Sequence, residues 1–225
     1  MSTSPAYRGR GETPAQAWAE LSQGNQRFVQ GTREHPNQDV EARTSLTEGQ
    51  VPRAVFFGCA DSRVAAEIIF DQGLGDLFVV RTAGHVVGTS VLGSLEFGVA
   101  ALGIPLIVVL GHDSCGAVAA TLDAMDSGDM PSGFLRDVVE RIMPSVLSAR
   151  KHGAATADEV EAEHVRHTAR LLANRSAHIG EHVRGGSLGI VGATYDLGQG
   201  RAKVITAEGV GLPLADLPPA GTAAF

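Results

Sequence analysis

Three features of the sequence predict an α/β fold: a mainly parallel central β-sheet flanked by helices, with an antiparallel edge strand and an N-terminal helical arm. Short apolar runs alternate along the chain with segments of helical periodicity. The first three runs are apolar throughout, as in parallel strands that are buried on both faces. The last run is followed by a turn and a second strand-like segment, which indicates a hairpin at one edge of the sheet.

The first predicted element is a helix that starts near residue 13. Thr13, Pro14 and Gln16 give the pattern of a helix start, with a threonine cap, a proline in the first turn and a glutamine three residues after the cap. Apolar residues follow at helical spacing, namely Trp18, Leu21, Phe28 and Val29. Residues 32–52 are polar with two prolines, so we expect a loop and a short connection there.

The remaining elements alternate between strands and helices. Strands are predicted over residues 54–57, 77–80, 105–110 and 188–191, and the edge strand over residues 202–205. Helices are predicted over residues 64–70, 89–102, 115–127, 134–150 and 157–183. On the last and longest helix we expect the ionisable side chains to face solvent: His164, His167, His178, His182, Glu159, Glu161 and Glu163.

The composition is that of one globular unit. The chain has 225 residues, of which 44% are hydrophobic and 19% charged, and this excludes an intrinsically disordered protein. We expect a flexible tail over residues 1–12, a single domain over residues 13–210 and a second tail over residues 211–225.

Charge and hydropathy exclude several classes of partner. The net charge is −7 and no run of lysine or arginine occurs, which argues against nucleic acid as a partner. The longest uncharged apolar stretch, residues 97–111, is shorter than the ~20 residues that a membrane span needs. The first residues lack a basic segment followed by an apolar one, so we predict a cytoplasmic protein without a secretory signal.

Two cysteines and a histidine follow predicted strands. Cys59 comes after the first strand, and His112 and Cys115 share the turn after the third. Because open α/β sheets bind ligands beyond the carboxyl ends of their strands, these side chains can meet. Thiolates and imidazole are ligands that zinc prefers, and three of them leave a fourth position open. The alternative to a zinc site is that the two cysteines are small buried side chains of the core and that His112 is a polar residue of the turn.

Asp61 and Arg63 follow the first cysteine directly. Three roles are open to Asp61. It could be a fourth zinc ligand, it could pair with Arg63 and turn toward the metal-bound water, or it could cap the helix that begins near Val64.

The segments Cys59-Ala-Asp-Ser-Arg-Val64 and Gly111-His-Asp-Ser-Cys-Gly116 resemble two motifs of the β-class carbonic anhydrases. The resemblance covers about residues 14–210. It implies a single catalytic domain, one zinc ion (Zn²⁺) per subunit and a homodimer that often pairs into a homotetramer. The implied reaction is the reversible hydration of CO2 to bicarbonate and a proton, by attack of zinc-bound hydroxide.

The resemblance also implies roles for individual residues. Cys59, His112 and Cys115 match the zinc ligands, with Asp61 as a conditional fourth ligand, and Asp61 and Arg63 match a catalytic dyad. The substrate pocket would be lined by Gln50, Phe78, Ala83, Phe97 and Gly116. Ala83 replaces a valine of the plant-type enzymes, and Phe97 replaces a tyrosine that comes from the neighbouring subunit. Phe56, Arg81 and Tyr195 stand where some bacterial members bind an inhibitory bicarbonate through Trp, Arg and Tyr.

Further expectations concern pH, proton transfer and assembly. The Asp-x-Arg spacing suggests a switch in which Asp61 binds zinc at low pH and pairs with Arg63 at higher pH. His85 is a candidate proton carrier because its ordinary pKa is ~6.5, and the alternative is a turn histidine bonded to backbone. Given the implied dimer, we expect the apolar face of the N-terminal helix to pack on the partner subunit, and the alternative is that it covers the chain's own sheet.

Three other functions compete with CO2 hydration. The same zinc site could hydrolyse CS2 or COS, because an apolar funnel admits either gas. A metal-free enzyme could use Cys115 as nucleophile and His112 as its base. A non-catalytic scaffold needs neither a ligand set nor an Asp61–Arg63 pair, so the sequence argues against it.

Overall fold

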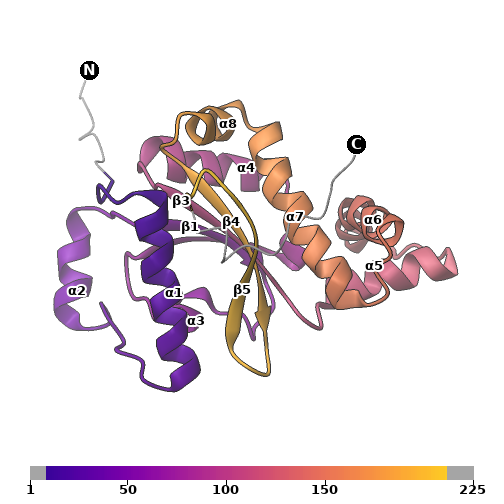
Figure 1. The fold of residues 1–225 in the computed structure, drawn as a ribbon, viewed down its shortest axis with the longest axis horizontal. Helices are drawn as coiled ribbons and strands as arrows, with labels where there is room; N and C mark the ends of the chain where they lie inside the picture. The colour runs from indigo at the N-terminus through magenta and orange to yellow at the C-terminus, as the bar shows by residue number, and fades with distance from the viewer. Residues whose placement is uncertain (1–8, 212–225) are drawn as a thin grey trace.

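The computed structural model describes residues 9–211 and contains a five-stranded sheet in the order β2-β1-β3-β4-β5 (Figure 1). The strands are β1 (Ala54–Cys59), β2 (Leu77–Thr82), β3 (Leu106–His112), β4 (Gly189–Asp196) and β5 (Arg201–Glu208). The first four are parallel, and β5 pairs with β4 in the antiparallel sense. The predicted fold class is therefore confirmed. Most of the two predicted tails lies outside the described residues, and the domain boundaries stay predictions.

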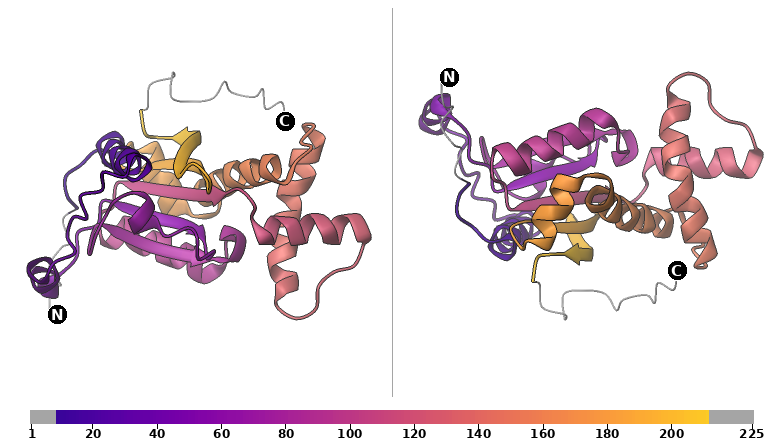
Figure 2. Two further views of the ribbon diagram at one scale, coloured as in Figure 1. Left: turned by 90° about the horizontal axis from the view of Figure 1, so that it is seen from below. Right: turned by 90° about the horizontal axis from the view of Figure 1, so that it is seen from above.

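Eight α-helices accompany the sheet in the described part of the chain: α1 (Pro14–Gln30), α2 (Val40–Ser45), α3 (Ala66–Ile69), α4 (Thr89–Glu96), α5 (Gly116–Ser127), α6 (Leu135–Lys151), α7 (Ala157–Arg175) and α8 (Ala177–Arg184). Shorter helical turns are η1 (Leu46–Glu48), η2 (Ala83–His85) and η3 (Phe97–Ala101). Helices α5 and α6 project from one end of the sheet, as Figure 2 shows. None of the helices among residues 9–211 has the length and apolar character to cross a lipid bilayer.

The central strands are apolar throughout because both of their faces are covered. Val55 and Phe57 of β1 point into a core shared with α4, α7 and α8. Ala54 and Phe56 point the other way, into a core shared with α1 and α3. The alternation of side chains along a strand thus serves two cores in place of a core and a solvent face.

Strand β2 differs from this expectation, since all six of its residues are only half-buried. The reason is its place in the sheet. It pairs with β1 on one side and forms the edge of the sheet on the other. Its apolar sequence therefore leaves a half-exposed edge on the single chain.

Helix α1 begins where the sequence predicts, but its apolar face packs on the chain's own sheet and not on a partner subunit. The Thr13 hydroxyl accepts a hydrogen bond from the Gln16 backbone N–H, and the Gln16 side chain accepts one from Thr13, which completes a capping box. Trp18 and Leu21 are buried against the chain's own sheet and Phe70. The expectation that this apolar face packs on a partner subunit is therefore wrong for Trp18 and Leu21.

Two other local predictions need correction. The single helix expected over residues 157–183 is two helices, because Ser176 ends α7 and its hydroxyl caps α8 by accepting from the Ile179 N–H at 3.1 Å. Serine favours caps over helix interiors, since its side chain competes for backbone hydrogen bonds. The loop expected over residues 32–52 contains the short helix α2.

Helix α7 is buried on more sides than its sequence indicates. It contacts β3 and β4 of the sheet and also α5 and α6. Glu161 and His164 are therefore almost fully buried, and the expectation that both face solvent is wrong. Glu159 is exposed, as expected, and closes a capping box with Thr156.

A buried carboxylate ties the N-terminal segment to the turn that follows α3. Asp71 is 2% exposed, and its oxygens accept hydrogen bonds from Arg27 Nε at 2.6 Å, Glu34 N at 3.0 Å and His35 N at 3.1 Å. Burial alone would raise the pKa of Asp71, but these hydrogen bonds lower it below its ordinary value.

We expect Asp71→Ala to lower the free energy of unfolding by about 3–5 kcal/mol, because it leaves the Arg27 guanidinium and the N–H groups of Glu34 and His35 without their acceptor. The folded-state pKa lies below the ordinary value, so the carboxylate stabilises the protein above about pH 4. This contribution is lost as the pH falls through the folded-state pKa. Chemical denaturation at fixed protein concentration, at pH 7 and in acid, measures both effects.

The exposed Asp129 provides the control, since its carboxylate makes no contact that the structure records among the described residues. Asp129→Ala should leave the free energy of unfolding within about 0.5 kcal/mol of the parent. An Asp71→Ala protein as stable as the parent at pH 7 would show that the cluster contributes little.

Candidate metal centre

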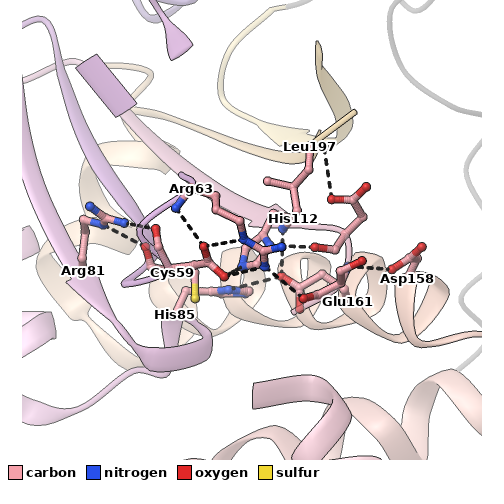
Figure 3. Close-up of polar contacts among 11 residues, drawn as sticks. Cys59, Arg63, Arg81, His85, His112, Asp158, Glu161 and Leu197 are labelled. Atoms are coloured by element: carbon pink, nitrogen blue, oxygen red, sulfur yellow. Dashed lines mark hydrogen bonds and ion pairs between the residues drawn. The ribbon is translucent and has the colours of Figure 1, made fainter. Parts of the chain in front are cut away.

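Cys59, His112 and Cys115 meet at one end of the sheet, and Figure 3 shows the first two of them with the polar groups around them. Cys59 ends β1, His112 ends β3, and Cys115 caps the N-terminus of α5. Their ligand atoms all lie within 4.8 Å of one another, and all three residues are buried. The sequence prediction that these side chains converge is therefore confirmed.

One ring nitrogen of His112 makes a hydrogen bond, and the other has no hydrogen-bond partner among the described residues. Its Nδ1 lies 2.8 Å from the Asp113 carbonyl oxygen, which can only accept, so Nδ1 carries the proton and donates. This leaves a lone pair on Nε2. That atom is buried and has no hydrogen-bond partner among the described residues. A buried imidazole nitrogen facing two thiols is what a metal ligand requires.

The two thiols influence each other's ionisation. Hydrogen bonding with Cys115 lowers the pKa of Cys59 despite its burial. The same contact with Cys59, together with burial, raises the pKa of Cys115. One thiolate therefore forms readily and holds the other thiol protonated. Metal binding displaces thiol protons, so a cation here would hold both sulfurs as thiolates.

Asp61 pairs with Arg63 at the open side of the cluster. Its carboxylate accepts from Arg63 Nε at 2.9 Å, from Arg63 Nη2 at 2.7 Å and from the Arg63 backbone N–H at 2.9 Å. The hydrogen bonds from Arg63 hold the pKa of Asp61 well below its ordinary value. Oδ2 lies 3.9 Å from His112 Nε2, so the ionised carboxylate also faces the ligand cluster.

Of the roles expected for Asp61, the structure has the arginine pair. It does not have the helix cap, because α3 begins only at Ala66 and makes no side-chain cap. Asp61 is also absent from the ligand cluster itself. This is the arrangement that the expected pH switch assigns to the higher pH.

Arg81 supports the loop that carries Cys59 and Asp61. Its Nε donates to the Cys59 carbonyl at 2.8 Å, and its Nη2 donates to the Asp61 carbonyl at 2.6 Å. The resemblance assigned Arg81 to an inhibitory bicarbonate site, so this positioning contact was missed. The sequence signal for it was an arginine at the end of an otherwise apolar strand.

The two residues grouped with Arg81 are buried, unlike Arg81 itself. Phe56 is fully buried against Phe70, on the sheet face that α1 and α3 cover. Tyr195 is 5% exposed and lies opposite His112 in the register of β3 and β4.

The residues expected to line a substrate pocket lie on the surface of the single chain. Gln50, Ala83, Phe97 and Gly116 are exposed, and Phe97 leaves 50% of its surface uncovered. Phe78 is half-buried and lies against Phe97, with 6.0 Å between the ring centroids. A cavity of about 410 Å³ beside His112 is lined by none of these five.

His85 does not fit either role expected for it. It is fully buried, and burial lowers its pKa well below the ordinary value. A neutral ring without solvent contact does not carry protons to bulk water. Neither ring nitrogen has a hydrogen-bond partner among the described residues, so His85 is not bonded to backbone either.

Comparison with known proteins agrees with the site geometry. A family model described as carbonic anhydrase matches residues 54–202. Carbonic anhydrase 2 of Mycobacterium tuberculosis is 60% identical over 189 residues, which cover 84% of this chain and 91% of that protein. A carbonic anhydrase of Mycolicibacterium smegmatis is 58% identical over 191 residues, covering 85% of this chain and 93% of that one.

Solved structures extend the likeness to the fold. The Coccomyxa β-carbonic anhydrase in complex with acetazolamide has a TM-score of 0.65 and 26% identity, covering 73% of this chain and 77% of that one. A chain from the crystal structures of two tetrameric β-carbonic anhydrases of Sordaria macrospora has a TM-score of 0.66 and 26% identity, covering 72% of this chain and 84% of that one. The sequence motifs, the cluster and these relatives agree, and the chain belongs to the β-carbonic anhydrase family.

Proposed function

We propose that this chain catalyses the reversible hydration of CO2 to bicarbonate and a proton, with zinc as its metal. The observation that carries the proposal is the buried Cys59–His112–Cys115 cluster with an ionised Asp61 at its open side. Two thiolates and one imidazole match the ligand preference of zinc, and three protein ligands leave a fourth position free. When bound, zinc lowers the pKa of water and so supplies hydroxide near neutral pH.

Asp61 and Arg63 prepare the open side of the cluster for this reaction. The two hydrogen bonds from the Arg63 guanidinium keep Asp61 ionised and hold its carboxylate in one orientation. An ionised carboxylate only accepts hydrogen bonds. A water next to Asp61 Oδ2 therefore turns an O–H toward Asp61 and presents a lone pair in another direction, where CO2 can meet it.

We infer that the active enzyme is a homodimer. The edge strand β2 is half-exposed along its whole length, and the ring of its residue Phe78 lies against that of the exposed Phe97. Gln50, Ala83 and Gly116 are exposed on the single chain, so a substrate pocket that includes them needs a second chain to close it.

We place the enzyme in the cytoplasm and its catalytic domain over residues 13–210. Both cysteines are free and belong to the ligand cluster, which suits a reducing compartment. The elements that carry the site run from β1 to α7, within these boundaries.

Purified protein should contain about one zinc ion per chain, and His112→Ala or Cys115→Ser should remove most of it, because each deletes one of three ligands. Elemental analysis by mass spectrometry measures the content. His178→Ala is the control, since His178 lies exposed on α8 away from the cluster. Zinc-free parent protein whose activity is lost on alkylation of Cys115 would favour the thiol enzyme.

Stopped-flow hydration of CO2 should show a loss of about 10²–10⁴-fold in kcat for Asp61→Asn, with the zinc content unchanged. The amide keeps the size of Asp61 but loses its charge and half of its acceptor capacity. Because Arg63 lowers the pKa of Asp61 far below neutrality, the carboxylate is ionised at both pH 7 and pH 8.5. The fold-loss should therefore be the same at both values.

A zinc-loaded parent protein that hydrates no CO2 at either pH would contradict the proposal. The same preparation is then assayed with COS and CS2. Turnover of either gas would assign the site to that hydrolysis.

Sedimentation velocity should give a mass of at least about twice 23.4 kDa for the parent chain. Phe97→Lys should shift the protein toward the monomer and lower its activity, because it places a charge on the half-exposed apolar surface beside β2. A monomeric parent with full activity would contradict the inferred dimer.

A further inference from the structure

Three side chains of α7 reach the backbone around the candidate metal ligands. Asp158, Glu161 and His164 are spaced three residues apart, which places neighbours in this series on adjoining parts of the helix surface. Each makes a hydrogen bond to a different segment of the site, and none contributes an atom to the ligand cluster. Figure 3 shows Asp158 and Glu161 beside the strand end that carries His112.

Glu161 holds the backbone of the histidine ligand. Its Oε1 accepts from the His112 N–H at 3.2 Å. The preceding residue is glycine, and a Cβ there would lie 2.3 Å from the same Oε1, so Gly111 gives the carboxyl room to reach the strand. No lysine or arginine in the described chain pairs with Glu161, which is 1% exposed, and its Oε2 has no partner there. Burying such a group is costly, so the contact with β3 calls for a function.

His164 holds the turn that faces the first cysteine. Its Nε2 lies 2.9 Å from the Gly84 carbonyl, which can only accept, so Nε2 carries the proton. Its Nδ1 then accepts from the Ser145 hydroxyl at 2.8 Å. Gly84 is the middle residue of η2, and η2 begins directly after Thr82. Thr82 is the register partner of Cys59 in the sheet.

The geometry of this turn leaves little freedom for Gly84. Its φ is +57°, and a Cβ would lie 2.7 Å from Ala117 Cβ, so η2 is seated against the first turn of α5.

Asp158 holds the turn before the second cysteine. Its Oδ1 accepts from the Ser114 N–H at 3.1 Å. Ser114 has φ of +53°, in the left-handed region, and it directs the chain from His112 to Cys115. The carboxylate therefore supports a backbone conformation that serine rarely adopts.

His85 fills the space between two of these side chains. Its ring centroid is 4.3 Å from that of His164, and its Nδ1 is 3.5 Å from Glu161 Oε1. Ser145 of α6, His164, His85 and Glu161 thus form a continuous row of buried polar side chains that reaches the backbone of β3.

We propose that α7 is the positioning element of the metal centre, and that Asp158, Glu161 and His164 set the metal affinity and geometry through the backbone of Ser114, His112 and Gly84. The inference rests on the metal site proposed above. These three are positioning residues, because each acts through a segment that bears or faces a ligand. Loss of such a support costs about 10–100-fold in metal affinity.

The test compares variants that delete each hydrogen bond with variants that keep it. Glu161→Leu, His164→Leu and Asp158→Ala delete the contact. Glu161→Gln, His164→Gln and Asp158→Asn retain an acceptor or donor at a similar place. Glu163→Leu and His167→Leu are matched controls on α7, since Glu163 contacts Ser148 and surface arginines and neither residue contacts the three supported segments.

Two readouts do not depend on turnover. Competition with a chromophoric chelator gives the zinc Kd, and the visible spectrum of the cobalt(II)-loaded protein reports thiolate ligation and coordination geometry. We expect the deletion variants to weaken zinc about 10–100-fold and to change the cobalt spectrum. The conservative variants and the controls should stay within about threefold of the parent.

Each other outcome overturns a stated part of the inference. Folded deletion variants with the parent's Kd and spectrum would overturn it, as would conservative variants that lose as much affinity as the deletions. Asp158 is exposed, so Asp158→Ala and Asp158→Asn keep the test decisive if a core variant fails to fold. A parent protein that binds neither zinc nor cobalt would overturn the proposed function together with this inference. If the parent binds both metals and the deletion variants bind them equally well, only the inference about α7 is overturned.

Discussion

The parallel pairing of β1 with β3 is the constraint on which the metal centre depends. It aligns Gly58 with Leu110, so the two strands end side by side and deliver Cys59 and His112 to the same edge of the sheet. The turn after β3 then returns Cys115 to the cluster as the cap of α5. Residues more than fifty positions apart meet without any long loop, because the sheet fixes their distance. The buried apolar side chains of both strands therefore support the site as directly as its own polar groups do.

The site is held mainly through backbone atoms. Arg81 binds carbonyl groups of the first loop, and side chains of α7 bind the N–H and carbonyl groups of three further segments. Among the described residues, Asp61 is the acidic side chain that faces the ligand atoms, and its partner Arg63 is half-exposed. The ligand cluster is therefore supported by buried side chains such as Glu161 and His164, and the charged Asp61–Arg63 pair lies on its accessible side. A small apolar substrate offers few handles for binding, so precise placement of the groups around the metal carries much of the chemistry.

The sequence predicted the sheet, its hairpin edge and the three ligands because those signals are local. Apolar runs mark strands, and the cysteines and the histidine stand directly after two of them. It failed where contacts with several other elements decide the environment. Glu161 and His164 lie in a helix whose sequence is rich in charge, and they are buried because that helix packs against β3, η2 and α6. His85 was misjudged for the same reason, and β2 because its place at the edge depends on strand order, which periodicity does not encode.

Close packing around the site limits which residues this chain can accept at two glycine positions. At position 111 even a methyl group would displace the carboxyl of Glu161, and at position 84 it would collide with Ala117. A larger residue at position 111 would therefore require a change at Glu161, and one at position 84 would require a change at Ala117. A designer who wished to transplant this metal site would need to move α7 and the two glycines with it, since the three ligands alone would arrive without the backbone supports that orient them.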